Sequence, residues 1–450
     1  MVMMAVPFSH MAVLLLAAIR IVTADARLHE NYVPLDFEGN VVRESNTHDA
    51  PAPASAAGEE EESLIAMQFA PDPNEGRDIL SMIASGELHL AALRYSPRSF
   101  STARGYSDVH GEFCAYDPAL HSSYATVSEI MGASYLCGEH RYTLPLHEVV
   151  AAVEHSSSSS SSRSHGTTTT STTMRPLPVS GLIFHEGHSG AGLISGAIAT
   201  FRDALVVSEH PALRDALGAC DVLRNRHRYE NCSPDAQRSL VSDVVSLLSR
   251  TRDAGVHRAY FKLSSESSAY VREVRAVLPD AAWAFVYRDA DHALAKTTGG
   301  RRGGSCVKSR RNPSSALVAK SSGRRIDMEG LTNHEVCALH LSSLLDVATR
   351  EHADTGTGML ISYDRDLTSD AADDVLLNTI LPHFGLGGEI DDSARERVAG
   401  VLSKRSGRGG VGDWAGEVVV VSEEVRAASR AFVWESTEAM DNLARASRVL

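Results

Sequence analysis

The pattern of hydrophobic and polar positions changes at about residue 178. From there on, short apolar runs rich in β-branched residues alternate with longer stretches of helical periodicity. Each run is apolar almost throughout, which is typical of a strand buried on both faces. The predicted strands are 181–185, 204–208, 259–263, 283–287 and 359–363.

Helical patterns separate these strands. The clearest is 334–352, where apolar residues recur at close to every 3.6 positions. The other predicted helices are 192–202, 234–251, 267–278, 370–380, 392–402 and 423–450. Strands that alternate with helices require crossover connections, which favour a parallel sheet. The sequence therefore predicts an α/β domain over 178–450, a three-layer sandwich with a central parallel sheet.

The region before this domain has weaker patterns. Residues 63–150 are mixed, with helical patterns at 78–93 and 128–136 and no catalytic motif, so we interpret them as an N-terminal accessory region. A Ser/Thr-rich insertion at 151–177 is expected to be a solvated loop, because such a tract cannot bury apolar surface. Residues 27–62 are polar and acidic and are predicted to be a disordered linker.

The first residues suggest targeting. The apolar run Met11–Ile19 is followed by Ala24-Asp25-Ala26, a small-x-small cleavage pattern. The run is shorter than the roughly 20 residues of an ordinary membrane span, and Arg20 interrupts it. We favour a cleaved signal peptide at 1–26. A signal anchor and the absence of any targeting role stay open, and no stable membrane span is expected unless the segment is an uncleaved anchor.

Composition narrows the class of protein. The chain of 450 residues is 43% hydrophobic and 22% charged, as is ordinary for a globular protein. Its net charge of −14 argues against a protein that coats nucleic acid or anionic membrane, so any anionic ligand needs a local positive site. The six cysteines fit a secreted protein with disulfides, and the local pair Cys114 and Cys137 is favoured among 15 possible connectivities.

A basic insertion at 297–325 interrupts the domain. It contains eight Lys or Arg residues and no acidic residue. We favour a disordered basic loop. An anion-binding flap over the active site is the second interpretation, and nucleic-acid binding is the third, because no aromatic residues are interleaved for base stacking.

A glycine-rich turn follows the first predicted strand of the domain. Gly187 and Gly190 allow the backbone to approach a ligand closely, because neither carries a Cβ. Successive N–H groups of such a turn can point at one anion, aided by the positive end of the next helix. Ser189 can add a hydroxyl donor and His188 a charge. A tight turn without a ligand is the alternative. The full turn is His185-Glu186-Gly187-His188-Ser189-Gly190-Ala191-Gly192.

Other chemistries fit less well. The turn lacks the lysine of the nucleoside-triphosphatase signature, and the first glycine of the dinucleotide fingerprint is replaced by His185. The hydrolase motif Gly-x-Ser-x-Gly is absent. No metal site is expected: there is no Cys-x-x-Cys pair, and His185, His188 and His210 lack a convergent third ligand.

These residues carry a family resemblance. The stretch 181–217 resembles the 5′-phosphosulfate-binding region of P-loop sulfotransferases, in their divergent branch, and Ser208-Glu209-His210-Pro211 resembles its Ser-Glu-Pro element. The stretch 283–296 resembles the 3′-phosphate-binding strand and turn, with Arg288 at the Arg position and Lys296 in place of a Ser. Residues 363–367 are similar to a Tyr-Glu/Asp-x-Leu element. The likeness covers about 178–410 in the right order.

The resemblance implies a P-loop nucleoside triphosphate hydrolase-like fold and a sulfotransferase activity. The co-substrate would be 3′-phosphoadenosine 5′-phosphosulfate, without a metal, and the acceptor a hydroxyl of a small molecule or glycan in the Golgi lumen or outside the cell. Nucleic acid is not expected as a partner. The implied cofactor-binding residues are Gly187, Ser189, Gly190, Gly192, Arg288, Lys296 and Lys404. The candidate catalytic residues are Glu209 as base, His185 as second base and His188 beside the bridging oxygen.

The turn departs from the family pattern. His188 stands where the family has Lys or Arg, and Ala191-Gly192 replaces a Ser-Thr pair. An ordinary His is mostly neutral at pH 7 and stabilises anionic charge less well. A catalytically inactive nucleotide- or phosphate-binding relative is therefore the alternative. Three structural roles also stay open: Glu209 as a helix cap, His185 as a core histidine, and Arg288 as a partner of Asp289 or Asp291.

Overall fold

The computed structural model describes residues 78–95, 105–116, 126–134, 137, 140–160, 174–225, 232–299, 305–369, 371–403 and 420–447. All of them belong to one compact unit, 71–450. The expected signal peptide, the expected linker and Lys404 lie outside the described residues.

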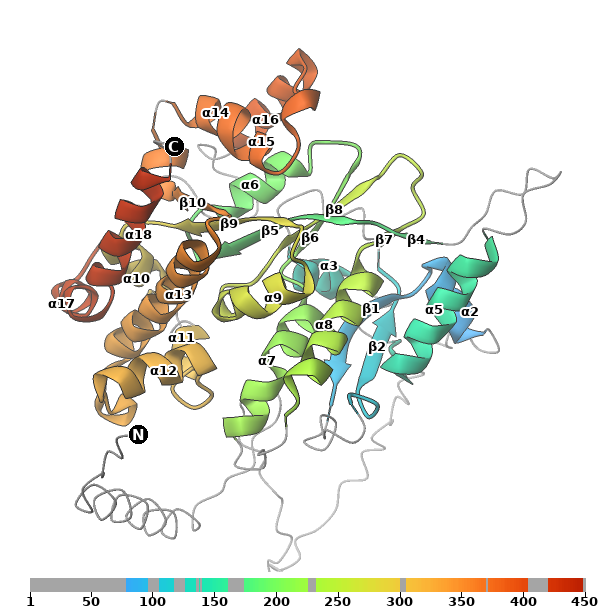
Figure 1. The fold of residues 1–450 in the computed structure, drawn as a ribbon, viewed down its shortest axis with the longest axis horizontal. Coiled ribbons are helices and arrows are strands. Elements are labelled where there is room, and N and C mark those ends of the chain that lie inside the picture. Colours follow the sequence, from blue (N-terminus) through green and yellow to red (C-terminus); the bar gives the residue numbers. More distant parts are fainter. Residues whose placement is uncertain are drawn as a thin grey trace, which may run out of the picture. The chain divides into compact units, whose positions relative to one another are not determined.

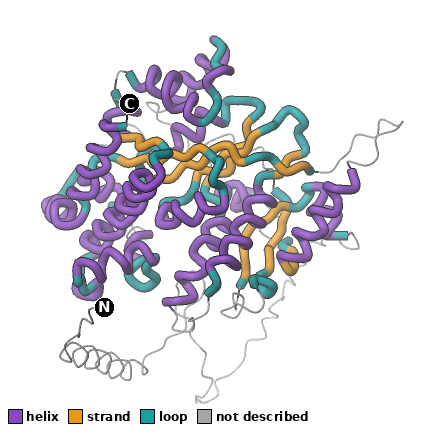
Figure 2. Tube along the Cα trace, in the orientation of Figure 1, coloured by secondary structure: helices purple, strands orange, loops and turns teal. Residues whose placement is uncertain are grey.

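A parallel sheet of five strands forms the centre of this unit (Figures 1 and 2). Its strands are β5 (Val179–His185), β6 (Ala204–Ser208), β8 (Arg258–Lys262), β9 (Ala282–Tyr287) and β10 (Met359–Ser362). The strand order is β10-β9-β5-β8-β6, and every neighbouring pair is parallel. The five predicted strands and the α/β prediction are thus confirmed.

The strands are apolar because both faces of the sheet are covered. Along β5, Leu182 and Phe184 face one hydrophobic cluster, while Ile183 between them faces the other. The same alternation holds on β9 for Phe285 and Val286, which are fully buried. Successive side chains of a strand point to opposite faces of the sheet, and here both faces need apolar residues. The strands therefore appear in the sequence as continuous hydrophobic runs.

Helices from different parts of the chain cover the two faces. One cluster joins the sheet to α6 (Ala191–Ile198), to the segment containing η5 (Tyr363–Leu367), α14 (Ala372–Val375), η6 (Leu376–Ile380) and α15 (Leu381–His383), and to α16 (Asp392–Ser403). The opposite face is covered by α7 (Pro211–Asn225), α8 (Pro234–Leu248), η3 (Glu266–Tyr270), α9 (Val271–Val277), α10 (Ala290–Thr298), α13 (Asn333–Thr355), α17 (Glu423–Phe432) and α18 (Trp434–Ala446). Figure 1 shows these two layers on either side of the sheet.

The accessory region folds onto the main domain. Its antiparallel sheet contains β1 (His89–Arg94), β2 (His110–Cys114) and β3 (Tyr142–Pro145), with α2 (Ile79–Ser85), α3 (Val127–Ala133) and α5 (Leu146–Ser160) around it. Strand β1 contacts α7, and both regions contribute to one hydrophobic cluster. A further short antiparallel pair is formed by β4 (Arg175–Pro176), which precedes β5, and β7 (Arg250–Thr251), which follows α8.

Some predicted elements differ from the structure. The helix expected over 78–93 ends at Ser85, because Gly86 adopts φ 75° as its C-cap, and β1 follows. The loop expected over 151–177 begins later, since α5 continues to Ser160 and the Ser156 hydroxyl donates to Ala152 O at 2.8 Å. The single helix expected over 423–450 is two helices separated at the buried Val433. Helices α7 and α10 had no predicted counterpart.

The basic insertion is ordered over 305–325, so its interpretation as a disordered loop is wrong there. It forms α11 (Ser305–Lys308) and α12 (Ser315–Arg324), and Cys306 is joined to Cys337 of α13. Short turns η4 (Met328–Gly330) and η7 (Gly387–Glu389) complete the described elements. The other disulfides are Cys220–Cys232 and the predicted Cys114–Cys137, which is confirmed. Within the described ranges, no helix has the length and apolar character needed to span a membrane.

Candidate anion-binding site at the turn after β5

The turn after β5 lies at the centre of the sheet's carboxyl edge. β5 is the first strand of this sheet in the chain, yet it lies between β8 and β9. Chain connections diverge to either side of it, and ligands of open parallel sheets bind at such a point. A glycine-rich turn joins this strand to helix α6, at the place in an α/β sheet that the sequence predicted.

The backbone of the turn is strongly constrained. Gly187, His188 and Gly190 have φ values of 100°, 50° and 84°, all in the left-handed region. Such conformations are costly for a residue with a side chain and cluster at functional sites. At Gly190 a Cβ would lie 2.2 Å from the Tyr363 ring, so only glycine fits there.

The amides of the turn are available to a ligand. Within the described residues, no protein acceptor is recorded for the N–H groups of residues 188–192. Consecutive unpaired amides in left-handed turns form anion-binding concavities, and the start of α6 adds the partial positive charge of a helix N-terminus. The expectation of a phosphate cradle formed by the backbone of Ser189, Gly190 and Gly192 thus has the geometry that it needs.

The Ser189 hydroxyl does not serve this cradle. Its Oγ is buried and donates to Val286 O of β9 at 2.8 Å. A hydroxyl has one proton to donate, so this group is committed to the protein. The expectation that the Ser189 side chain donates to an anion is therefore wrong for this structure.

His185 is held in one tautomer by the turn itself. The N–H of Gly187 donates to His185 Nδ1 at 3.0 Å, so Nδ1 is an acceptor and the proton of a neutral ring lies on Nε2. That Nε2 lies 3.6 Å from Glu209 Oε1. Double protonation of His185 would break the Gly187 hydrogen bond. His185 therefore faces Glu209 as a donor, while its backbone is bonded at both N–H and C=O to the Ser268 hydroxyl.

Glu209 is an ionised partner of Lys262. It follows β6 with φ 51°, its N–H donates to Lys262 O at 2.7 Å, and the Lys262 ammonium contacts Glu209 Oε1. Burial opposes ionisation of this carboxyl, but the nearby His185 ring and the charge of Lys262 outweigh it and hold the pKa of Glu209 well below its usual range. The helix-capping alternative for Glu209 is not realised, because His210 Nδ1 accepts the Ala212 N–H at the start of α7.

Glu186 is a buried acid within the turn. Its side chain is 2% exposed, and Oε1 accepts the Arg288 N–H at 2.8 Å. Oε2 is buried and has no hydrogen-bond partner. Burial raises the pKa of Glu186 to about 8, and the charges of Asp364 and Asp289 add to the effect against the opposing contribution of Arg288. Glu186 is therefore mostly protonated at neutral pH. No sequence motif singled it out, because burial of a turn residue is not visible in the sequence.

Arg288 joins β9 to the turn. Its Nη1 donates to His188 O at 3.1 Å, and its guanidinium lies 4.9 Å from the centre of the Tyr363 ring. Its ion-pair partner is Asp364 at 3.8 Å, so the alternative that named Asp289 or Asp291 is wrong. Arg288 thus lies beside the cradle, with part of its hydrogen-bonding capacity used by the protein.

His188 lies among positive groups at the mouth of the turn. Loss of hydration lowers the pKa of His188, and the nearby His185, Lys296 and Arg288 lower it further. His188 is consequently neutral at pH 7 in the absence of an anion. The same interactions show that four basic side chains predicted from the sequence, His185, His188, Arg288 and Lys296, lie within electrostatic range of one another.

The cavities described in the structure lie elsewhere. One is formed by α12, α13 and α18, and a second lies beside the Cys220–Cys232 disulfide. Among the described residues, no group of three or more His, Cys, Asp or Glu side chains could hold a metal ion.

The chain was compared with protein families, curated proteins and solved structures. No protein-family model matches the chain, and no curated protein is significantly similar to it in sequence. The chain is similar in structure to bacterial sulfotransferases. A sulfotransferase from Mycobacterium avium is 10% identical, with 57% of this chain and 76% of that chain covered and a TM-score of 0.34.

Two further solved structures belong to the same class. The sulfotransferase domain from the curacin biosynthetic pathway is 10% identical, covering 57% of this chain and 98% of its own length with a TM-score of 0.30. A sulfotransferase from Alicyclobacillus acidocaldarius is 13% identical, covering 61% and 99% with a TM-score of 0.32. At these values no residue role is transferred, and the fold class follows from the strand order and the turn after β5.

Proposed function

We propose that the turn binds the 5′-phosphosulfate of 3′-phosphoadenosine 5′-phosphosulfate and that the protein transfers its sulfuryl group to a hydroxyl acceptor. The observation that carries the proposal is the row of unpaired amides at residues 188–192, at the divergence point of a parallel sheet and surrounded by basic side chains. Arg288 and Lys296 are proposed to hold the 3′-phosphate, through charge-assisted hydrogen bonds. Lys404 is proposed as a further contact.

The proposed reaction balances simply. The acceptor oxygen attacks sulfur in line, the bond between sulfur and the phosphate oxygen breaks, and adenosine 3′,5′-bisphosphate leaves with the negative charge. Positioning and electrostatic stabilisation supply most of the catalysis in such loose transition states. His188 is proposed to donate to the leaving oxygen, because it becomes more basic when an anion binds beside it.

Glu209 is the proposed recipient of the acceptor proton. A depressed pKa makes it a weak base. A weak base is sufficient, however, because the hydroxyl proton of the acceptor becomes strongly acidic once the acceptor oxygen bonds to sulfur. His185 is proposed to orient Glu209 through Nε2–H, rather than to act as the base itself, because Gly187 holds the ring in that tautomer.

A second candidate is a nucleotide- or phosphate-binding protein without transferase activity. It is favoured by the engagement of the Ser189 hydroxyl with Val286 and of Arg288 with His188 O. Both groups would have to change partners to contact a ligand.

Incubation with the sulfur-labelled co-substrate and a panel of hydroxyl acceptors separates the two candidates. The transferase predicts label on an acceptor, lost in Glu209→Gln and strongly reduced in Arg288→Ala. The binding protein predicts retention of the nucleotide with no labelled product. A protein that shows neither nucleotide binding nor turnover would rule out both candidate functions.

A secretory-pathway location is part of this proposal. The three disulfides among the described residues support it, because such bonds persist mainly in oxidising compartments. An acceptor displayed on a secreted or Golgi glycan would be reached from there.

A further inference from the structure

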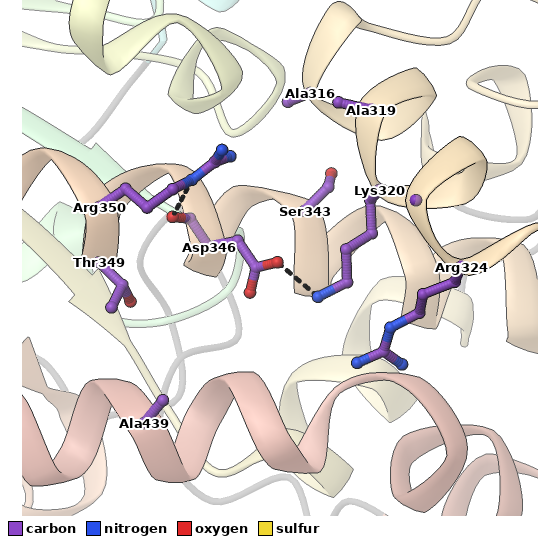
Figure 3. Close-up of a pocket in the computed structure, with 10 residues that line it drawn as sticks. Ala316, Ala319, Lys320, Arg324, Ser343, Asp346, Thr349, Arg350 and Ala439 are labelled. Atoms are coloured by element: carbon purple, nitrogen blue, oxygen red, sulfur yellow. Dashed lines mark hydrogen bonds and ion pairs between the residues drawn. The ribbon is translucent and has the colours of Figure 1, made fainter. Parts of the chain in front are cut away.

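A groove of about 440 Å³ lies between α12, α13 and α18, away from the turn after β5 (Figure 3). Helix α12 lines it along one face, and α13 forms the opposite side. Lys320 and Arg324 of the basic insertion, which the proposed transfer reaction does not use, thus line a concave surface. The volume lies in the range typical of small-molecule sites.

The groove is rich in positive charge. Lys320, Arg324 and Arg350 line it together with one carboxylate, Asp346, in a chain whose net charge is −14. Figure 3 shows Lys320 paired with Asp346. Asp346 is held on its other oxygen by the Ser436 hydroxyl at 2.7 Å. The acid is therefore satisfied by the protein, and the lining keeps an excess of positive charge.

Two arginines at the rim have capacity for a ligand. Arg350 Nε donates to Asp346 O at 3.1 Å, and among the described residues no partner is recorded for its two terminal amino groups. Arg324 contacts Glu435 at 2.7 Å, but the Glu435 side chain is 82% exposed, so this pair is weak in water and can exchange for a ligand. A guanidinium binds a carboxylate or sulfate with two parallel hydrogen bonds.

Two further features fit a sugar. Thr349 also lines the groove, and its Oγ1 is buried without a hydrogen-bond partner among the described residues. Trp434 is not part of the lining but is 52% exposed at the start of α18, directly before the Glu435 that contacts Arg324. An exposed indole offers a flat apolar face and an N–H donor, the combination that suits the C–H face and hydroxyls of a pyranose. Gly323, which has no side chain, and the small side chains of Ala316, Ala319 and Ala439 leave room for a ring.

We infer that this groove binds an anionic saccharide, a sugar chain that carries carboxylate or sulfate groups. Arg324 and Arg350 hold its charges, Lys320 adds to the positive field, and Trp434 stacks on a sugar ring. Binding here does not depend on transfer chemistry at the turn, so the inference stands or falls apart from the proposed function. The chain has a net charge of −14, so an anionic ligand needs a locally positive site. The cationic groove supplies such a site.

The test is calorimetric titration of the full chain with a tetrasaccharide of alternating uronic acid and sulfated hexosamine. A neutral glucose tetrasaccharide and inorganic sulfate serve as the comparison ligands. The acidic tetrasaccharide is expected to bind, Arg350→Gln and Arg324→Gln each to weaken it about tenfold, and Trp434→Ala to weaken it as well. Arg311→Gln is the matched control, because Arg311 is an exposed arginine of the same insertion that does not line the groove.

The outcomes are distinct. Weakening in the groove variants but not in Arg311→Gln supports the inference, and these exposed side chains can be replaced without unfolding the chain. Equal affinity for the neutral tetrasaccharide overturns it, as does unchanged affinity in Arg324→Gln and Arg350→Gln. Inorganic sulfate bound as tightly as the saccharide would also overturn it, because the site would then hold a simple anion. Failure to bind adenosine 3′,5′-bisphosphate bears only on the proposed transfer reaction.

Discussion

Replacing Glu186 by Gln removes one titrating proton from the turn and keeps the shape of the side chain. In the folded protein burial raises the pKa of Glu186 from 4.5 to about 8. The unfolded chain has no such burial, so its carboxyl ionises near the ordinary value. Over the interval between the two values, the folded protein retains a proton that the unfolded chain has lost.

The sign of the effect follows from this difference in bound protons. Below the unfolded pKa both states are protonated and pH has no effect through this group. Between the two pKa values the unfolded state binds fewer protons, so the free energy of unfolding falls as pH rises. Above the folded pKa both states are ionised and the loss is complete. The loss reaches about 5 kcal/mol, at about 1.4 kcal/mol for each pH unit in between.

Urea denaturation of the wild type and of Glu186→Gln measures this loss. Between pH 5.5 and 7.5 the free energy of unfolding of the wild type should fall by about 3 kcal/mol more than that of the variant. All other titrating groups are common to both proteins, so the difference isolates Glu186. If the two curves run parallel over this interval, Glu186 is not a buried neutral acid and the description of the turn is incorrect.

The same proton is expected to affect ligand binding. A neutral Glu186 can lie beside a bound anion, while an ionised one repels it. Binding of adenosine 3′,5′-bisphosphate should therefore weaken from pH 7 to pH 9 in the wild type and change less in Glu186→Gln. His188 is common to the wild type and Glu186→Gln, so any proton that it takes up on binding cancels in the comparison of the two proteins.

Four more changes probe the turn and the fold. Gly187→Ala should lower the free energy of unfolding in urea by about 1–3 kcal/mol, because φ is 100° while the added Cβ meets Ser265 only at 3.6 Å; Gly323→Ala, with open space around it in α12, should instead stabilise by up to about 1 kcal/mol. His188→Lys should tighten binding of adenosine 3′,5′-bisphosphate in calorimetry, and weaker binding would argue against an anion at this turn. Loss of the Cys306–Cys337 disulfide by double replacement with Ser should lower the free energy of unfolding by about 3–4 kcal/mol; an unchanged value would mean that the bond does not form.

The central sheet could be predicted from the sequence because its pattern is simple. A strand buried on both faces has few polar residues, and β5, β6, β8, β9 and β10 all satisfy this condition. The turn after β5 was equally visible, since two glycines placed between an apolar strand and a helix are typical of a tight turn with left-handed backbone. The helix α10 was missed because its short, polar stretch resembles a loop, and only its Asp289 N-cap marks where it begins.

The chemistry of the site could not be predicted to the same degree. Residue types identify Glu209, His185 and Arg288, but their partners come from distant segments. Lys262 holds Glu209, and Asp364 rather than a neighbouring Asp pairs with Arg288. The burial of Glu186 depends on β9 packing beside the turn, a contact made by residues about a hundred positions apart. The basic insertion was likewise predicted to be disordered. Its acidic partners lie on α13 and α18, far away in the sequence, so its ion pairs could not be recognised there.

Binding of adenosine 3′,5′-bisphosphate to the full chain tests the central claim most directly. Calorimetric titration at neutral pH should show binding by the wild type, about tenfold weaker binding by Lys296→Ala, and unchanged binding by Arg311→Ala, an exposed arginine of the basic insertion. A wild type that gives no heat at high protein concentration and no thermal shift with this nucleotide would contradict the claim that the turn after β5 is a nucleotide-phosphate cradle.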